Sequence, residues 1–286
     1  MNWLRILVEL YYDFQKGRIA YFNRLNLLPK EVREEIEDRI TYVGDNLKKM
    51  EKEIEKEIKR EIQNYPLYTE ILRRIKGIGP ILAADLIAWT CTERDFLMAK
   101  NHPFLQSIKQ LPYAKIEKFN DKMVRVRLPP VLTVAKYPSD FYKYCGLIPG
   151  CRRKRGEQVN YNPKLKTLFW KIVMQILRVG KSHYVYLYKT WKAEYLKKYE
   201  QRKDVKAPRA LAHYTAIKKV SRHLALTVYL AYKYFNNEPA YLPYPVSILG
   251  HSIEPPFVDG LKGPEYLNFL VEYALQFDKR EVKRPA

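Results

Sequence analysis

A glycine turn between two apolar stretches holds the backbone groups best suited to bind a ligand. Residues 75–87 read Ile-Lys-Gly-Ile-Gly-Pro-Ile-Leu-Ala-Ala-Asp-Leu-Ile. Gly77 and Gly79 permit a tight bend because glycine adopts positive φ without steric cost. Pro80 suits the first turn of a following helix, where its missing N–H has no cost, and the small Ala83 allows two helices to approach closely. Such a bend presents backbone N–H groups at a helix N-terminus, an arrangement that binds phosphate.

The side chains next to this turn are basic and would support a phosphate contact. The pattern resembles a helix-hairpin-helix, a module that holds the backbone of nucleic acid without reading its sequence. An ordinary αα-hairpin with a glycine turn is the alternative interpretation. The predicted contact residues are Arg73, Arg74, Lys76, Gly77, Ile78 and Gly79.

A second basic cluster lies farther along the chain. Residues 151–156 read Cys-Arg-Arg-Lys-Arg-Gly, the densest run of positive charge in the sequence. Guanidinium and ammonium groups hold phosphate well but do not attack it. The predicted second phosphate contact consists of Arg152, Arg153, Lys154 and Arg155.

Positive charge is distributed unevenly over the 286 residues. The formal net charge is +21, which implies a polyanionic partner. Residues 1–70 contain 13 Lys and Arg against 14 Asp and Glu, whereas residues 71–286 contain 39 against 17. We therefore expect the first part to be a scaffold and the second part to form the binding surface.

Composition narrows the class of protein. Hydrophobic residues make up 47% of the chain. This share is enough for a sizeable core and argues against a chain that is disordered throughout. No apolar run approaches the ~20 residues that span a bilayer, and the N-terminus has no signal-peptide pattern, so we expect a cytoplasmic protein without a membrane partner. Three cysteines and five scattered histidines have no metal-ligand spacing, and we expect neither a metal nor a cofactor. Abundant Tyr, Lys, Glu and Ile suggest a hyperthermophilic host.

The N-terminal part is predicted to be a helical hairpin. Residues 3–26 place apolar side chains at helical spacing, and residues 29–62 do so over a longer helix. In the longer helix the spacing is mostly four and three, as in a coiled-coil seam. The seam consists of Val32, Ile36, Ile40, Val43, Leu47, Met50, Ile54, Ile58 and Ile62. We expect residues 1–66 to form an antiparallel coiled-coil hairpin, folded on itself or paired with a second copy as a homodimer.

Residues 67–235 are predicted to form a mainly helical domain with an insert at about residues 97–135. Within the insert, residues 115–127 alternate apolar and charged side chains around an Asn-Asp pair, which is typical of a β-hairpin. Farther on, Asn162 and Pro163 are suited to begin a helix.

Residues 236–286 are predicted to form a Pro- and Tyr-rich C-terminal arm with a final helix. Before this arm, one predicted helix carries a stripe of aromatic residues at helical spacing. The stripe could stack on bases, but we interpret it as core, with the lysines between its members on the outer face. It consists of Tyr184, Tyr188, Trp191, Tyr195 and Tyr199.

The order of these motifs resembles the bridge-RNA-guided insertion-sequence transposases of the IS-one-ten type. Asn23-Arg24-Leu25 resembles the tip of that family's coiled coil, and residues 75–84 resemble the start of its C-terminal transposase domain. Tyr-Pro-Ser-Asp-Phe at 137–141 and Tyr-Cys-Gly-Leu-Ile-Pro at 144–149 resemble the next block. The resemblance covers about residues 5–235. It implies DNA as the partner, with structured RNA conceivable.

Two departures from that family argue against catalysis. Its members begin with a RuvC-like nuclease domain that binds Mg²⁺, but only about thirty residues precede the long helix here. The position of that family's nucleophilic serine corresponds to Arg153 or Lys154 in this sequence. Cys151 is a nearby thiol that a cationic loop would activate, but it is out of register, so we predict no catalytic residues.

Sequence alone therefore predicts a non-catalytic DNA-binding protein derived from a transposase of a mobile element. One alternative is an active recombinase subunit, acting in DNA recombination and transposition with a separate nuclease. A further alternative is a structural protein of a mobile element or virus that packages nucleic acid.

Overall fold

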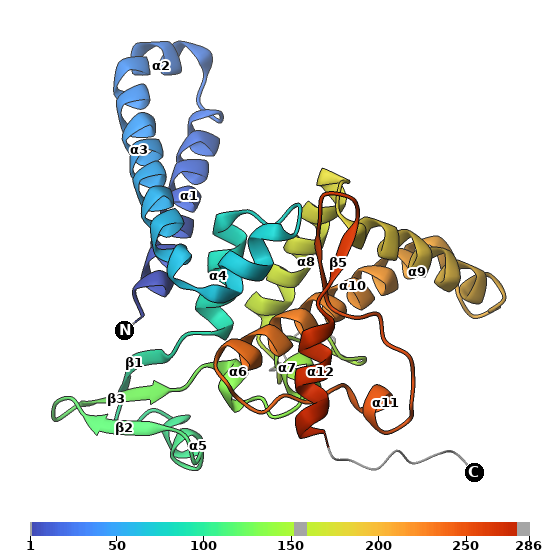
Figure 1. The fold of residues 1–286 in the computed structure, drawn as a ribbon. Coiled ribbons are helices and arrows are strands. Elements are labelled where there is room, and N and C mark those ends of the chain that lie inside the picture. The colour runs from blue at the N-terminus through green and yellow to red at the C-terminus, as the bar shows by residue number, and fades with distance from the viewer. Residues whose placement is uncertain (1, 152–158, 279–286) are drawn as a thin grey trace. The chain divides into compact units, whose positions relative to one another are not determined.

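The computed structural model describes residues 2–151 and 159–278, without the side chains of residues 37–40. This part of the chain is mainly helical and contains two small antiparallel sheets (Figure 1). The predicted fold class, mainly α with a β insert, is confirmed at that level. The chain divides into two compact units, Met1–Tyr65 with Thr92–Leu128, and Pro66–Cys91 with Pro129–Ala286.

The first unit begins with a pair of long helices. Its elements are α1 (Trp3–Leu25), α2 (Lys30–Glu35), α3 (Glu37–Glu61) and the 3₁₀ turn η1 (Ile62–Asn64). Helices α1 and α3 lie side by side, with α2 at the far end (Figure 1). Asn2 caps α1 by accepting a hydrogen bond from the Arg5 N–H at 3.3 Å. The predicted second helix is not continuous, because the backbone leaves helical geometry at Ile36 (φ −110°, ψ 12°).

Contacts along this pair fix an antiparallel register. Near the tip, the ring of Phe22 lies 2.7 Å from the position that a Cβ at Gly44 would take, so the ring packs directly on the backbone there. In the middle, Arg18 Nε donates to Glu51 at 2.6 Å. Of the predicted seam, Ile58 and Ile62 are fully buried, whereas Val43 and Met50 are 40% and 51% exposed. The seam is therefore covered toward its C-terminal end, whereas the side chains of Val43 and Met50 are open to solvent and Leu47 between them is half-buried.

The first unit also contains the insert. Strands β1 (Arg94–Ala99), β2 (Lys115–Lys118) and β3 (Met123–Leu128) form an antiparallel sheet in the order β1-β3-β2, and α5 (Leu105–Lys109) lies between β1 and β2 in the chain. The predicted hairpin is confirmed, with Ile116 opposite Val126. Strand β1 was not expected from the sequence. It contributes Asp95, whose pKa the Arg125 guanidinium holds well below its usual range through hydrogen bonds.

The second unit is built around one long, buried helix, α10. Helix α9 lies along it, and α7, α8 and α12 also pack against it (Figure 1). Its elements are η2 (Leu67–Ile71), η3 (Leu72–Arg74), α4 (Pro80–Thr90), α6 (Val131–Val134), α7 (Pro138–Tyr144), α8 (Pro163–Val179), α9 (His183–Glu200), α10 (Pro208–Phe235), α11 (Tyr244–Ser247), β4 (Phe257–Asp259), β5 (Pro264–Tyr266) and α12 (Asn268–Phe277). The C-terminal half of α10 is buried on nearly every side, which makes it the core of the unit.

Local signals in the sequence explain where the helices of this unit begin. Asn162 accepts hydrogen bonds from the N–H groups of the first turn of α8, at 3.0 and 3.2 Å, as predicted. Ser182 caps α9 in the same way. The aromatic stripe of α9 is core only in part: Tyr184 and Trp191 are buried, whereas its other three members are half-buried. Tyr188 Oη lies 2.7 Å from His213 Nδ1 on α10.

The C-terminal segment contributes to the core of the second unit. Phe257 on β4 is fully buried, with its ring centroid 4.4 Å from that of Tyr184 and 5.2 Å from that of His223. Leu270 on α12 is also fully buried. None of the helices in the described part of the chain combines the length and the apolar character that crossing a membrane requires.

Candidate nucleic-acid interface

The glycine turn connects a short irregular helical segment to α4. The π-helical turn η2 and the 3₁₀ turn η3 precede it, where a regular helix was expected. Gly77 has a φ of +109°, which favours glycine, and Gly79 is the N-cap of α4, which begins at Pro80 as the sequence indicated. Ala83 and Ala84 are fully buried on α4. The turn therefore has the predicted bend, and the two small residues that follow it are buried.

The two glycines of the turn have different surroundings. A Cβ at Gly77 would lie 2.7 Å from the Cα of Ile176, so the turn packs directly on the backbone of α8. A Cβ at Gly79 would meet no described atom within 4 Å. The side chain of Ile78 is buried. Gly77 and Ile78 therefore anchor the turn, and Gly79 leaves the N-terminus of α4 open to approach.

One carboxylate beside this turn accepts hydrogen bonds from two backbone N–H groups. Asp259, at the end of β4, accepts the Lys76 N–H through Oδ2 at 2.7 Å and the His183 N–H through Oδ1 at 2.8 Å. Its neighbour on the β4–β5 hairpin, Glu265, forms an ion pair with Arg74. Two N–H groups that converge on one carboxylate form a cradle for an oxyanion.

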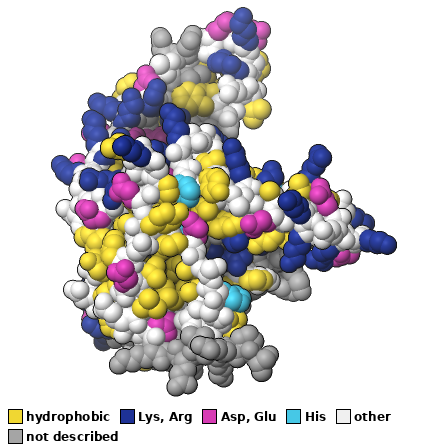
Figure 2. All heavy atoms as spheres, turned by 45° about the vertical axis from the view of Figure 1, so that its right-hand side comes forward, with side chains coloured by type: hydrophobic (Ala, Val, Ile, Leu, Met, Phe, Trp, Pro, Cys, Tyr) yellow, Lys and Arg dark blue, Asp and Glu magenta, His cyan; other side chains and the backbone are white. Residues whose placement is uncertain are grey.

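Lysines surround this cradle. A cavity of about 420 Å³ beside Asp259 is lined by Lys76, Lys181 and Lys189, together with His183. More basic side chains follow along the outer face of α9 and its connection to α10, as Figure 2 shows by the dark blue groups on the projecting helical pair. The exposed members are Lys181, Lys189, Lys197, Lys198, Lys203, Lys206 and Arg209.

The structure brings together only part of the predicted site. Arg73 and Lys76 are exposed next to the turn, whereas the Arg74 guanidinium is already paired. The second predicted contact lies outside the described residues; it comprises Arg152, Arg153, Lys154 and Arg155. Immediately before it, Cys151 is buried.

No protein-family model, no curated protein and no solved structure matches this chain. The resemblance to transposases therefore remains an expectation from the motifs quoted above. Within the described ranges, no group of three or more His, Cys, Asp or Glu residues is arranged to hold a metal ion.

Sequence reasoning missed the members of the site that come from elsewhere in the chain. Asp259 lies 183 residues after Lys76, and no local pattern relates the two. A weaker signal did exist for Lys189, because the aromatic stripe of α9 turns the lysines between its members outward. The lysine side of the site was therefore accessible to sequence reasoning, and the acidic side was not.

Proposed function

We propose that this protein binds DNA by contacting the phosphate groups of the DNA backbone and does not cleave the DNA. The observation that carries the proposal is the cradle of the Lys76 and His183 N–H groups, held by Asp259 at 2.7 and 2.8 Å among exposed lysines. In this structure the Asp259 carboxylate fills both donors. A phosphate oxygen that displaces it would meet the same two N–H groups, and nearby ammonium groups favour the phosphate, which carries charge along a whole strand.

In this proposal the turn acts as a helix-hairpin-helix. Gly79 allows a strand to approach the N-terminus of α4, while Lys181 and Lys189 contact neighbouring phosphates. Contacts of this kind give affinity and position and carry no sequence information. Cys151, the thiol nearest in sequence to the place of the family's serine, is buried, which supports binding without strand cleavage.

The α1–α3 pair would act as a coiled coil that joins two copies. Val43 and Met50 are exposed and seven residues apart on α3, so they lie on one face of the helix. A second copy would bury that face. The substitution Met50→Glu should then shift sedimentation from dimer to monomer, and a wild-type chain that sediments as a monomer at micromolar concentration would contradict this part of the proposal.

The salt dependence of binding tests the proposed phosphate contacts. We expect the affinity for a labelled duplex, measured by fluorescence anisotropy, to fall at least about tenfold between 50 and 200 mM salt. The double variant Lys181→Glu and Lys189→Glu should lower affinity and flatten the salt slope. A matched control reverses Lys16 and Lys48, exposed on α1 and α3.

Two outcomes would contradict the proposal. One is an affinity that hardly changes with salt. The other is an equal loss in the control pair, because general charge rather than this surface would then explain the binding. Cleavage of the duplex by the purified chain would instead favour the recombinase alternative.

A further inference from the structure

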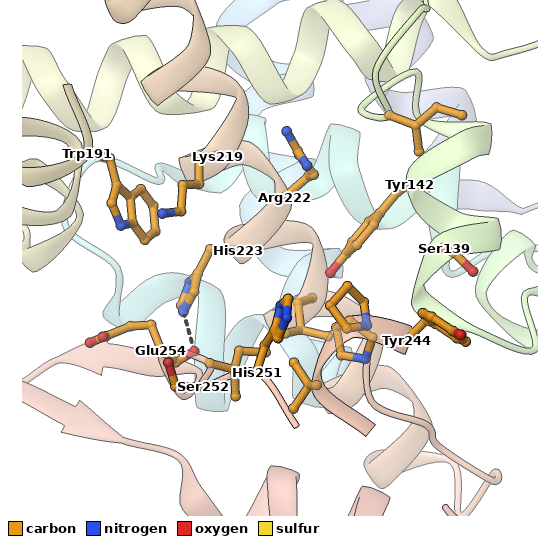
Figure 3. A pocket seen from close by; sticks show the side chains of 16 residues that line it. Ser139, Tyr142, Trp191, Lys219, Arg222, His223, Tyr244, His251, Ser252 and Glu254 are labelled. Atoms are coloured by element: carbon orange, nitrogen blue, oxygen red, sulfur yellow. Dashed lines mark hydrogen bonds between the residues drawn. The ribbon is translucent and has the colours of Figure 1, made fainter. Parts of the chain in front are cut away.

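A second cavity in the second unit has no role in the proposed phosphate contacts. It has a volume of about 560 Å³ and lies between α7, α9, α10 and the segment 243–254 (Figure 3). This size is within the range of small-ligand sites, roughly 300–1000 Å³. Its residues are distinct from those that line the cavity beside Asp259.

Two cations on α10 line this cavity, and they differ in how far they are compensated. Lys219 and Arg222 are one helical turn apart, and both line the cavity. The Arg222 Nε is buried and has no hydrogen-bond partner among the described residues. The carboxylate of Glu194 lies 4.0 Å from Lys219 Nζ. Lys219 Nζ also lies over the Trp191 ring, 4.4 Å from its centroid, which stabilises the ammonium group. Arg222, with its unpartnered Nε, is therefore the less compensated of the two cations.

The pKa of Lys219 reflects this environment. Burial lowers this pKa most, the Glu194 carboxylate offsets part of that effect, and the Arg222 charge makes a smaller contribution that lowers it. Glu254 also lines the cavity, but Figure 3 shows its side chain directed away from Arg222. Its carboxylate instead accepts a hydrogen bond from Tyr266 Oη at 3.0 Å. An anion in the cavity would therefore give the Arg222 guanidinium the partner that its Nε lacks.

The remaining walls offer apolar surface and rings. Ile148 and Leu226 contribute aliphatic surface, and Pro243 and Tyr244 contribute rings. Tyr142 adds a hydroxyl, and burial raises its pKa, so the group stays protonated and able to donate. A ligand that fits these walls has a charged end and an apolar or aromatic body.

We propose that this cavity binds a nucleoside monophosphate, with its phosphate on Arg222 and Lys219 and its sugar and base against the apolar walls. Lys219, although it already lies 4.0 Å from the Glu194 carboxylate, can share a phosphate with Arg222, because a phosphate offers three acceptor oxygens. The forked guanidinium of Arg222 suits phosphate oxygens in particular. The nucleotide is either free or the phosphorylated end of a strand. This proposal does not depend on the phosphate contacts proposed at the glycine turn.

Calorimetric titration of the full chain tests the proposal. We expect adenosine 5′-monophosphate to bind at least about tenfold more tightly than adenosine or inorganic phosphate. Arg222→Gln and Lys219→Gln should each weaken binding about tenfold, and Arg222→Lys should weaken it less, because it keeps the charge but loses the fork. The control is Lys52→Gln, which removes the same charge from an exposed position on α3. Thermal unfolding identifies any variant that fails to fold.

Competition against a bound fluorescent nucleotide separates the two sources. If an oligonucleotide with a 5′- or 3′-phosphate displaces it better than the unphosphorylated strand, the ligand is a strand end. If no strand competes and the mononucleotide does, the ligand is free nucleotide. The absence of mononucleotide binding, or inorganic phosphate binding as tightly, would overturn the proposal. Failure here leaves salt-dependent duplex binding intact, so it is distinguishable from failure of the proposed function.

Discussion

Gly77 shows how a single residue couples the turn to the rest of the second unit. It combines a φ of +109° with close packing on the α8 backbone at Ile176. We predict that Gly77→Ala lowers the free energy of unfolding by about 2–4 kcal/mol, because the added methyl group meets backbone and the conformation is strained. Urea unfolding followed by circular dichroism measures this.

Gly79→Ala is the matched comparison, since φ at Gly79 is −81° and a Cβ there meets open space. Its effect on stability should stay below about 1 kcal/mol, while affinity for duplex falls because the methyl group stands in the path of a phosphate. Equal destabilisation by both substitutions would show that the close approach to α8 is not what requires glycine at position 77.

In this structure the Asp259 carboxylate occupies the position that we assign to a phosphate oxygen. The substitution Asp259→Asn removes one acceptor atom and one negative charge. We predict that affinity for duplex rises about threefold to tenfold, or ~0.7–1.4 kcal/mol, measured by anisotropy at constant salt. Asp13→Asn, on an exposed part of α1, is the control. The same gain in both variants would mean that net charge, and not the cradle, controls affinity.

At the scale of elements, the α1–α3 pair depends on one largely buried ionic contact. Burial tends to raise the pKa of Glu51, but hydrogen bonds from Arg18 and Gln15 outweigh it, so the pKa is lowered overall. A carboxyl with a lowered folded pKa contributes stability above its unfolded pKa, about 4.3, and loses that contribution as pH falls through the folded value.

We therefore predict that the chain loses stability on acidification below about pH 4.3 and that Glu51→Gln reduces this loss. Thermal unfolding at pH 7 and pH 3 measures both. Asp95, which also has a lowered pKa, contributes in the same direction, so the difference between wild type and variant is the informative quantity. An identical pH dependence in the two proteins would contradict the assignment to Glu51.

At the scale of the whole molecule, the uneven distribution of charge along the chain should determine how the protein binds nucleic acid. Residues 71–286 hold 39 Lys and Arg against 17 Asp and Glu, and this excess suits contact with many phosphates at once. We predict that reversing the charge of residues 152–155 weakens binding to unrelated duplexes by a similar factor, measured by anisotropy. Loss for one sequence only would mean that these four residues read bases. Footprinting adds a distinction, because a packaging protein leaves no preferred site.

Much of the fold follows from local patterns in the sequence. The cap at Asn162, the proline at the start of α4 and the alternation in residues 115–127 each depend on groups within a few residues of one another. Such interactions are decided by neighbours in the chain, so helices and the β-hairpin were predictable. Strand β1 was not, because its pairing with β3, from Arg94 with Leu128 to Ala99 with Met123, joins segments separated by α5 and β2.

What the sequence alone determined was the helical character of the chain, the bend at residues 77–79 and the location of positive charge. Only the tertiary structure decided what that bend contacts. Gly77 meets Ile176, and the Lys76 N–H meets Asp259, because α8 and the β4–β5 hairpin pack beside the turn. The cavity at Arg222 likewise exists only where α7, α9 and α10 meet. Packing between distant segments depends on the whole core, and no local spacing encodes it.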